Sequence, residues 1–294
     1  MADEAELVLD AKAELGEGAL WDSKQSRLLW IDILEGTVHT YDPASGRDEH
    51  VPVGQMVGTV VPRAAGGLML AVQHGFAAFD PRTKDLQILC DPESHLPHTR
   101  FNDGKCDPAG RFWAGTMPLG KDEGKPLGSL YRLDADHSVH KMFDGVGCSN
   151  GIVWTADRST MYYVDTFTSR IDAFDYDPTT GDITNRRTAI RTSRAQGYPD
   201  GMTIDAEGNL WVAFWSGHCV RCLDPGSGTV LHTIEVPALQ VTSCAFGGPD
   251  LGDLFITTAR TGLDPDALGR QPQAGGLFCA RPGARGVPAF EYAG

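Results

Sequence analysis

The sequence lacks any apolar run of the roughly 18 residues that a membrane-spanning helix requires. Its first residues, MADEAELVLDAKAELGEG, are acidic and lack the basic start and apolar centre of a secretory signal peptide. The first absence argues against a helical membrane protein, and the second argues against secretion. We therefore expect a cytoplasmic protein that has no membrane partner.

Basic residues are also few. The 294 residues include 25 Lys and Arg against 39 Asp and Glu, which gives a formal net charge of −14. A surface that binds nucleic acid or anionic lipid needs a basic patch that replaces counterions. The charge balance therefore predicts no nucleic-acid partner and favours small molecules or cations as ligands.

Cysteine is neither frequent nor regularly spaced. The seven cysteines are an odd number and lie mostly in apolar segments, which predicts reduced, buried thiols and no disulfide. Cys219 and Cys222 form a C-x-x-C pair, but no second pair completes a zinc site, so we expect two buried strand residues. The nine histidines are scattered, and none is predicted to belong to a metal-binding cluster.

No window sustains the apolar spacing of a long amphipathic helix, whereas 35 glycines and 18 prolines indicate many turns. A short segment rich in Leu, Trp, Tyr and Val instead recurs every 40 to 50 residues or so. Its six copies are LLWIDI, GLMLAVQ, RFWAGTM, MYYVDT, NLWVAFW and DLFITTA, aligned on Trp30, Leu70, Trp113, Tyr163, Trp211 and Phe255.

Each copy follows another short strand and a turn, and most copies precede a turn such as Asp-Pro-x-x-Gly. This period is typical of a four-stranded propeller blade. The sequence thus predicts an all-β, six-bladed β-propeller with antiparallel blades around a central channel, formed by residues 1–294 as a single domain. We expect residues 6–11 (ELVLDA) to supply the outer strand of the last blade.

Polar residues recur where the strand before each aromatic segment begins. Four of the six equivalent positions hold a carboxylate or an amide, namely Glu17, Asn102, Asn150 and Asp200, whereas the other two hold Val57 and Ser243. Each alone could cap a turn, as Asn and Asp commonly do. Together around one axis they form a hard oxygen cluster suited to Ca²⁺, Mg²⁺ or Mn²⁺, with Zn²⁺ less favoured.

Several stretches resemble the regucalcin and gluconolactonase family over essentially the whole chain. They are RFNDGKCDPAGRFWAGTM, SNGIVWTADRSTMYYVD, FDYDPTTGDITNRR, PDGMTIDAEGNLWVA, TSCAFGG and RQPQAGGLF, together with the terminal YAG. The resemblance implies a six-bladed propeller that hydrolyses aldonolactones with one divalent metal ion. It also implies that Glu17, Asn150 and Asp200 are metal ligands and that Arg100 and Asn102 bind the substrate, with Asp103 beside them.

The sequence departs from that family directly after the GTM motif, where related chains carry acidic residues, one of which is implicated in holding the sugar. In this chain residues 118–120 are Pro, Leu and Gly, and the acidic residues Asp122 and Glu123 come later. We therefore expect a lid over the site that is built differently.

The resulting prediction is a metal-dependent sugar lactonase, acting as a monomer or weak dimer, in which Asp200 is both a ligand and the general base. Ca²⁺ is the favoured ion, with Zn²⁺, Mn²⁺ or Mg²⁺ as alternatives. A calcium-binding regulatory propeller, or a hydrolase of another cyclic ester or an organophosphate, remains open. Residues 147–151 also match the G-x-S-x-G nucleophile elbow, but that motif needs a following helix, and the sequence predicts strands there.

Overall fold

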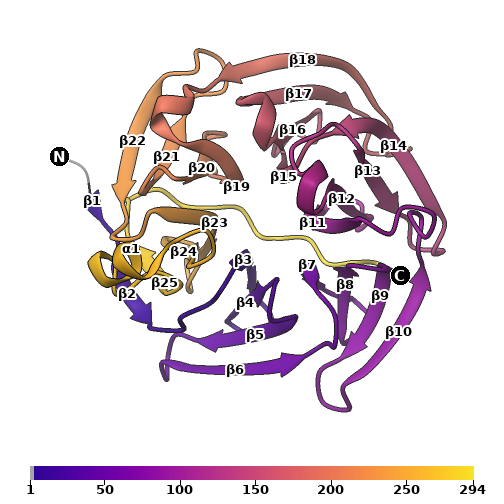
Figure 1. The fold of residues 1–294 in the computed structure, drawn as a ribbon. Helices are drawn as coiled ribbons and strands as arrows, with labels where there is room; N and C mark the ends of the chain where they lie inside the picture. The colour runs from indigo at the N-terminus through magenta and orange to yellow at the C-terminus, as the bar shows by residue number, and fades with distance from the viewer. Residues whose placement is uncertain (1–2) are drawn as a thin grey trace.

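The computed structural model describes residues 3–294, which form six β-sheets in a ring around a central channel (Figure 1). Each sheet is one blade of a six-bladed β-propeller, which confirms the predicted all-β architecture. Within residues 3–294, no helix is long and apolar enough to span a membrane.

Every blade has the same order of strands from the channel outwards, and blades 1 to 6 follow one another along the chain. The innermost strands are β3 (Gly16–Asp22), β7 (Val57–Pro62), β11 (Thr99–Cys106), β15 (Ser149–Trp154), β19 (Tyr198–Ile204) and β23 (Gln240–Gly247). The second strands are β4 (Arg27–Asp32), β8 (Leu68–Val72), β12 (Phe112–Pro118), β16 (Thr160–Asp165), β20 (Leu210–Trp215) and β24 (Asp253–Ala259). The third strands are β5 (Thr37–Asp42), β9 (Gly75–Asp80), β13 (Gly128–Leu133), β17 (Arg170–Tyr176), β21 (Cys219–Leu223) and β25 (Leu277–Ala280). The outermost strands are β6 (Arg47–Pro52), β10 (Asp85–Cys90), β14 (Val139–Val146), β18 (Ile183–Arg191), β22 (Val230–Glu235) and β2 (Glu6–Leu9).

The ring closes through the N-terminal segment. Strand β2 pairs antiparallel with β25 and completes blade 6, as predicted from the segment ELVLDA. Strand β1 (Asp3–Glu4), which was not predicted, adds to blade 5 as a short fifth strand parallel to β22. Two acidic residues carry no apolar alternation, so nothing in their pattern indicates a strand.

The aromatic repeat forms the core of the ring. The six aligned residues lie on the second strands and are all at most 2 % exposed. Aromatic pairs join neighbouring blades: Trp21 stacks on Phe255 at 5.7 Å between ring centroids, and Trp113 meets Trp154 edge-on at the same distance. Truncation of such a side chain costs about 3–5 kcal/mol, so these contacts hold the blades in register around the channel.

All seven cysteines are free thiols, and five of them are buried. Cys219 and Cys222 lie on β21 and are both buried, as predicted. They therefore serve as small apolar side chains of blade 5.

Short helices occupy the loops between blades or strands. Strand β12 is followed by the 3-10 turn η1 (Gly120–Asp122), β16 by η2 (Thr166–Thr168), and η3 (Arg194–Gln196) precedes β19. Helix α1 (Pro265–Arg270) joins β24 to β25 and begins at Asp264, whose carboxylate accepts the Ala267 amide at 2.7 Å. Because inner strands begin and second strands end at one face of the ring, η1, η2 and η3 all lie at that face.

The C-terminal segment crosses the opposite face of the ring (Figure 1). Bridges join Gly286 to Asp205 of blade 5 and Tyr292 to Arg63 of blade 2. Ala293 then donates to the carbonyl of Gly110 at 2.9 Å, which reaches blade 3. This segment therefore ties blades together and covers one end of the channel.

Candidate functional site

Every inner strand is irregular where it borders the channel. The pairing of each inner strand with its second strand shifts by a bulge between Glu17 and Leu20, Val57 and Thr59, Phe101 and Gly104, Ser149 and Ile152, Pro199 and Met202, and Val241 and Ser243. A bulge bends the strand and changes the direction in which its side chains point. The predicted polar positions lie at these bulges, which explains how they face the channel rather than alternate along a regular strand.

Glycines follow these positions because the inner strands approach one another closely. A Cβ atom at Gly201 would lie 2.5 Å from the Ser243 hydroxyl of the next blade. One at Gly151 would lie 2.6 Å from Met202. The Asn-Gly and Asp-Gly pairs in the sequence thus combine a polar side chain in the channel with a backbone that leaves room for the neighbouring blade.

The predicted site residues meet in one cavity. Glu17 comes from blade 1, Arg100 and Asn102 from blade 3, Asn150 from blade 4 and Asp200 from blade 5, and all five line a cavity of about 540 Å³ at the end of the channel where the inner strands begin. Their exposed fractions are 3–6 %. Residues far apart in the sequence therefore form one buried polar cluster.

A chain of hydrogen bonds fixes the amides of this cluster. The Arg100 guanidinium donates to Asn102 Oδ1 at 2.6 Å, and Asn102 Nδ2 donates to the Ser149 carbonyl at 2.7 Å and to Asn150 Oδ1 at 3.2 Å. Asn150 Nδ2 donates in turn to the hydroxyl of Thr166 at 2.8 Å. The Asn150 amide is held at both ends, so its oxygen has a defined direction in the cavity.

Three buried carboxylates lie close enough to perturb one another. Burial, and next the charge of Asp103, raise the pKa of Glu17 to about 8. Burial and the charge of Glu17 raise the pKa of Asp200 well above its usual range. Burial also raises the pKa of Asp103. The protein thus gathers negative groups in a place where it does not neutralise them fully.

The donor set fits a divalent cation. Asp200 Oδ1 and Asp103 Oδ2 are buried without a hydrogen-bond partner among the described residues, and an unpaired buried carboxylate oxygen is costly. Glu17, Asn150 and Asp200 offer only oxygen ligands, which hard cations prefer. A cation among them would also favour the ionised carboxylates.

Three further residues of the cavity were not predicted from the sequence. Thr166 ends the MYYVDT segment, and its hydroxyl donates to the Pro199 carbonyl at 2.9 Å while accepting from Asn150. The sulfur atom of Cys148 lies 3.6 Å from Asn150 Nδ2, and burial raises the pKa of the Cys148 thiol. Glu123 lines the cavity from the loop after η1.

The loop after β12 forms part of the cavity wall. Leu119 and Glu123 flank η1 and both line the cavity, so the acidic residue reaches the site from the far side of the turn. Burial lowers the pKa of Arg100, and the charges of Glu17 and Glu123 oppose that shift. The run Lys-Asp-Glu is typical of a solvated turn in the sequence, and only the fold shows that Glu123, although exposed, borders the cavity.

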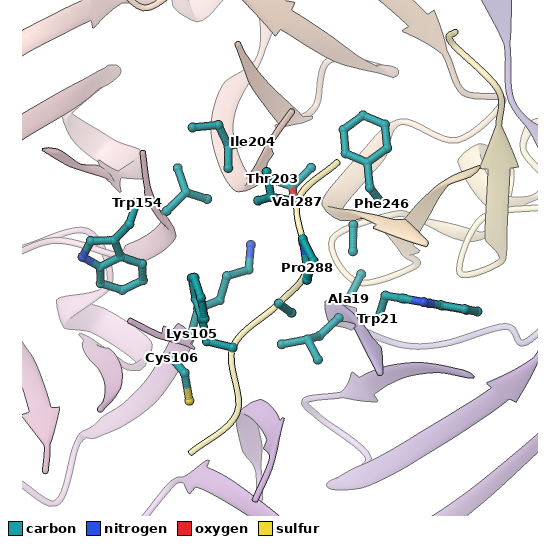
Figure 2. Close-up of a pocket in the computed structure, with 15 residues that line it drawn as sticks. Ala19, Trp21, Lys105, Cys106, Trp154, Thr203, Ile204, Phe246, Val287 and Pro288 are labelled. Carbon is teal, nitrogen blue, oxygen red and sulfur yellow. The ribbon is translucent and has the colours of Figure 1, made fainter. Parts of the chain in front are cut away.

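A second, smaller cavity of about 60 Å³ lies at the other end of the channel, where the C-terminal residues 287–290 line it. Figure 2 shows the Lys105 side chain extending between Trp154 and Pro288. Its ammonium donates to the Met202 carbonyl, and burial lowers its pKa while Asp103 opposes that shift. The lining of this cavity is mostly apolar, with Lys105 and Thr203 among its few polar residues, whereas the predicted site residues line the cavity at the opposite end.

The nucleophile-elbow alternative does not fit the structure. Residues 149–154 are one continuous strand, β15, rather than a strand and a following helix. Ser149 is fully buried, and its hydroxyl accepts a hydrogen bond from the Tyr163 hydroxyl at 2.8 Å. The motif therefore places no exposed serine at the site.

A sequence model of the SMP-30/gluconolactonase/LRE-like region matches residues 15–260. The chain belongs to this family. Regucalcin of Danio rerio is 42 % identical over 290 residues, which cover 98 % of each chain. Among solved structures, regucalcin from Agrobacterium tumefaciens, described as a calcium-binding protein, superposes with a TM-score of 0.93 at 32 % identity over 99 % of this chain and 98 % of its own.

A luciferin-regenerating enzyme is also similar, with a TM-score of 0.91 and 33 % identity over 98 % of this chain and 99 % of its own. The family thus includes both proteins described as enzymes and proteins described by their calcium binding. Membership of the family supports a gluconolactonase-like role for this chain.

Proposed function

We propose that this protein hydrolyses a sugar lactone to the corresponding aldonic acid, with one divalent cation held by Glu17, Asn150 and Asp200. The observation that carries the proposal is the convergence of these three buried oxygen donors with the buried Arg100 and Asn102 in one cavity. The family supplies the reaction class, since gluconolactonases are among its members.

Opening a lactone requires water to attack the ester carbonyl, so the site must activate water and stabilise negative charge on the carbonyl oxygen. A divalent cation supplies Lewis acidity and lowers the pKa of water when it is bound. Asp200 is the general base: its Oδ1 has no protein partner and can accept the proton of the attacking water. As the bond between the carbonyl carbon and the ring oxygen breaks, Asp200 returns that proton to the ring oxygen.

Arg100 and Asn102 orient the substrate. Arg100 Nη1 donates hydrogen bonds to the Phe101 carbonyl and to Asn102 Oδ1. The Nε–H group of Arg100 is buried and has no partner among the described residues, so it can donate to the substrate. A guanidinium has five donors in a fixed plane, which suits the two oxygens of a lactone ester. Asn102 holds this guanidinium and thereby fixes its direction towards the substrate.

Glu123 is proposed to bind a hydroxyl group of the sugar ring. It lines the same cavity as Arg100 from the lid, so its carboxylate borders the space in which the substrate would bind. A carboxylate accepts hydrogen bonds from hydroxyl groups, which distinguishes a sugar lactone from an unsubstituted one.

Ca²⁺ is the cation that we propose for the site. Two carboxylates and one amide oxygen form a hard ligand set without imidazole or thiolate. The cavity leaves room for water or substrate oxygens to complete the six to eight ligands that Ca²⁺ takes. Mn²⁺, Mg²⁺ and Zn²⁺ are the competitors against which this preference is measured.

The experiment is a hydrolysis panel monitored by proton release. It contains aldonolactones of several stereochemistries, a lactone of equal ring size without hydroxyl groups, and an organophosphate ester. We expect the highest kcat/KM for an aldonolactone and its loss in Glu17→Gln. A protein that binds Ca²⁺ with high affinity but hydrolyses none of the lactones would overturn the proposal in favour of a regulatory propeller.

A further inference from the structure

Two histidines and an aspartate meet on the outer two strands of blade 1, away from the channel. His39 on β5 pairs directly with His50 on β6, and Asp48 precedes His50 by two residues on the same strand. Residues two apart on a strand share a face, and directly paired residues of neighbouring strands lie side by side. One ligand atom from each of the three residues therefore lies within 4.8 Å of the others.

Neighbouring side chains hold this cluster in place. Asp48 accepts the Trp30 indole N–H through Oδ1 at 3.0 Å, which leaves Oδ2 facing His39 Nδ1 at 2.7 Å. His39 Nε2 lies 2.9 Å from the Thr37 hydroxyl, which can accept a hydrogen bond from it. The Trp30 indole thus orients the carboxylate, and the Thr37 hydroxyl contacts the second nitrogen of the imidazole. Metal-binding residues typically have such hydrogen-bond partners on the side away from the metal.

The aromatic rings form a row across the blade. Trp30 stacks on His39 with 3.8 Å between centroids, and His39 stacks on His50 at 5.2 Å. His39 and Asp48 are mostly buried, with side-chain exposures of 12 % and 9 %, whereas His50 is exposed. The cluster thus has two fixed members and one that reaches solvent, which provides a path for an ion.

Asp48 occupies an unusual position for the partner of a core tryptophan. In blades 3 and 5, the indole N–H groups of Trp113 and Trp211 donate to Asp107 and Asp205, which lie in the turn after the innermost strand. In blade 1 that bond goes instead to Asp48 on the outermost strand. Blade 1 therefore brings a buried carboxylate next to His39 and His50, a placement that blades 3 and 5 do not share.

We propose that His39, Asp48 and His50 form a second metal site, selective for a borderline transition-metal cation such as Zn²⁺. Two imidazole nitrogens and one carboxylate oxygen are a ligand set found in catalytic zinc sites. Asp48 and His50 lie two residues apart on β6, and His39 lies beside them on β5, so all three can reach one tetrahedral ion. Water takes the fourth position on the solvent side. The channel offers oxygen donors instead, so the two sites select different ions.

Binding of the cation requires His39 and Asp48 to give up the hydrogen bond between them. A neutral imidazole carries one ring proton. When His39 binds the cation through Nδ1, that proton is on Nε2 and donates to the Thr37 hydroxyl. The contact between Nδ1 and Asp48 Oδ2 is broken, and both atoms turn to the cation together with one nitrogen of His50. The cation then joins β5 to β6, and β6 is the edge strand of blade 1.

The test is equilibrium dialysis of the full chain against Zn²⁺, which counts bound ions. The variants are His50→Ala, His50→Gln and the control His74→Ala, which removes another exposed histidine that lies outside the cluster. We expect both His50 variants to bind one Zn²⁺ fewer than the wild type and the control, or to bind it at least about 10–100-fold more weakly. The same difference should persist in an Asp200→Asn background, which separates this site from the channel.

Co²⁺ substitution gives a second readout. The wild type should show the intense visible absorption bands of tetrahedral Co²⁺, and His50→Ala should lose them while it hydrolyses lactone at the wild-type rate. Equal Zn²⁺ stoichiometry and affinity in His50→Ala and wild type, or visible bands that survive this change, would overturn the proposed site. Neither result bears on the lactonase proposal, so the two can fail independently.

Discussion

Asn150 Nδ2 donates a hydrogen bond to the Thr166 hydroxyl at 2.8 Å, and that hydroxyl donates in turn to the Pro199 carbonyl. The hydroxyl therefore determines which end of the Asn150 amide faces the proposed cation. Thr166→Val keeps the shape but removes that bond. We expect the Ca²⁺ affinity measured by calorimetry to fall about 10–100-fold, which is typical when a residue that hydrogen-bonds to a metal ligand is replaced.

Thr166→Ser is the matched control, because it restores the hydroxyl and should restore most of the affinity. If Thr166→Val bound Ca²⁺ as tightly as the wild type, Asn150 would not depend on this hydroxyl for its orientation.

Steady-state kinetics can distinguish two possible roles of Arg100, substrate binding and transition-state stabilisation. If its guanidinium binds the lactone equally in the ground and transition states, Arg100→Ala raises KM and leaves kcat unchanged. If it stabilises the charge on the carbonyl oxygen, kcat and kcat/KM fall together. We expect the first pattern, since the proposed cation already polarises the carbonyl; unchanged steady-state constants would remove Arg100 from the site.

Glu123 should contribute to the recognition of hydroxyl groups. A hydrogen bond to a charged group is worth about 1.5–3 kcal/mol, so Glu123→Gln should raise KM for an aldonolactone about tenfold or more and should leave KM for an unsubstituted lactone nearly constant. Asp122→Asn is the control on the same turn, because its carboxylate pairs with Lys125 instead. Equal effects of the two changes on KM would contradict a specific contact by Glu123.

The closure of the ring by β2 predicts a stability effect. Deleting residues 1–11 exposes the edge of β25 and unseals blade 6. Thermal denaturation should show a clear fall in Tm, because the lost strand also covers apolar side chains of that blade. Deleting only residues 1–4 removes the two-residue pairing of β1 and should change Tm much less.

The sequence was sufficient to predict the blades and the residues that the ring brings together in the candidate site. Trp30, Trp113 and Trp211 recur at a period that only one kind of sheet repeat explains, and all three are buried in second strands as expected. Glu17, Asn150 and Asp200 were identified because a ring turns equal positions in each blade into neighbours, and the cavity contains them all.

The rest of the site depends on geometry that no local pattern carries. Thr166 and Glu123 reach the cavity from loops whose direction is set by packing against other blades. His39, Asp48 and His50 are separated by up to eleven positions, and only the register of β5 with β6 brings them together. The C-terminal segment lacks strand periodicity and is positioned by isolated bonds to several blades, such as that of Tyr292 to Pro62.

The most direct test of the central claim is the rate of D-gluconolactone hydrolysis by protein stripped of metal with a chelator and then titrated with Ca²⁺. The wild type should show no turnover above the spontaneous rate when stripped, and full recovery as the ion is returned. Asp200→Asn should stay inactive at every Ca²⁺ concentration. Full activity of the stripped wild type, or restored activity of Asp200→Asn, would contradict a metal-dependent lactonase with Asp200 as its base.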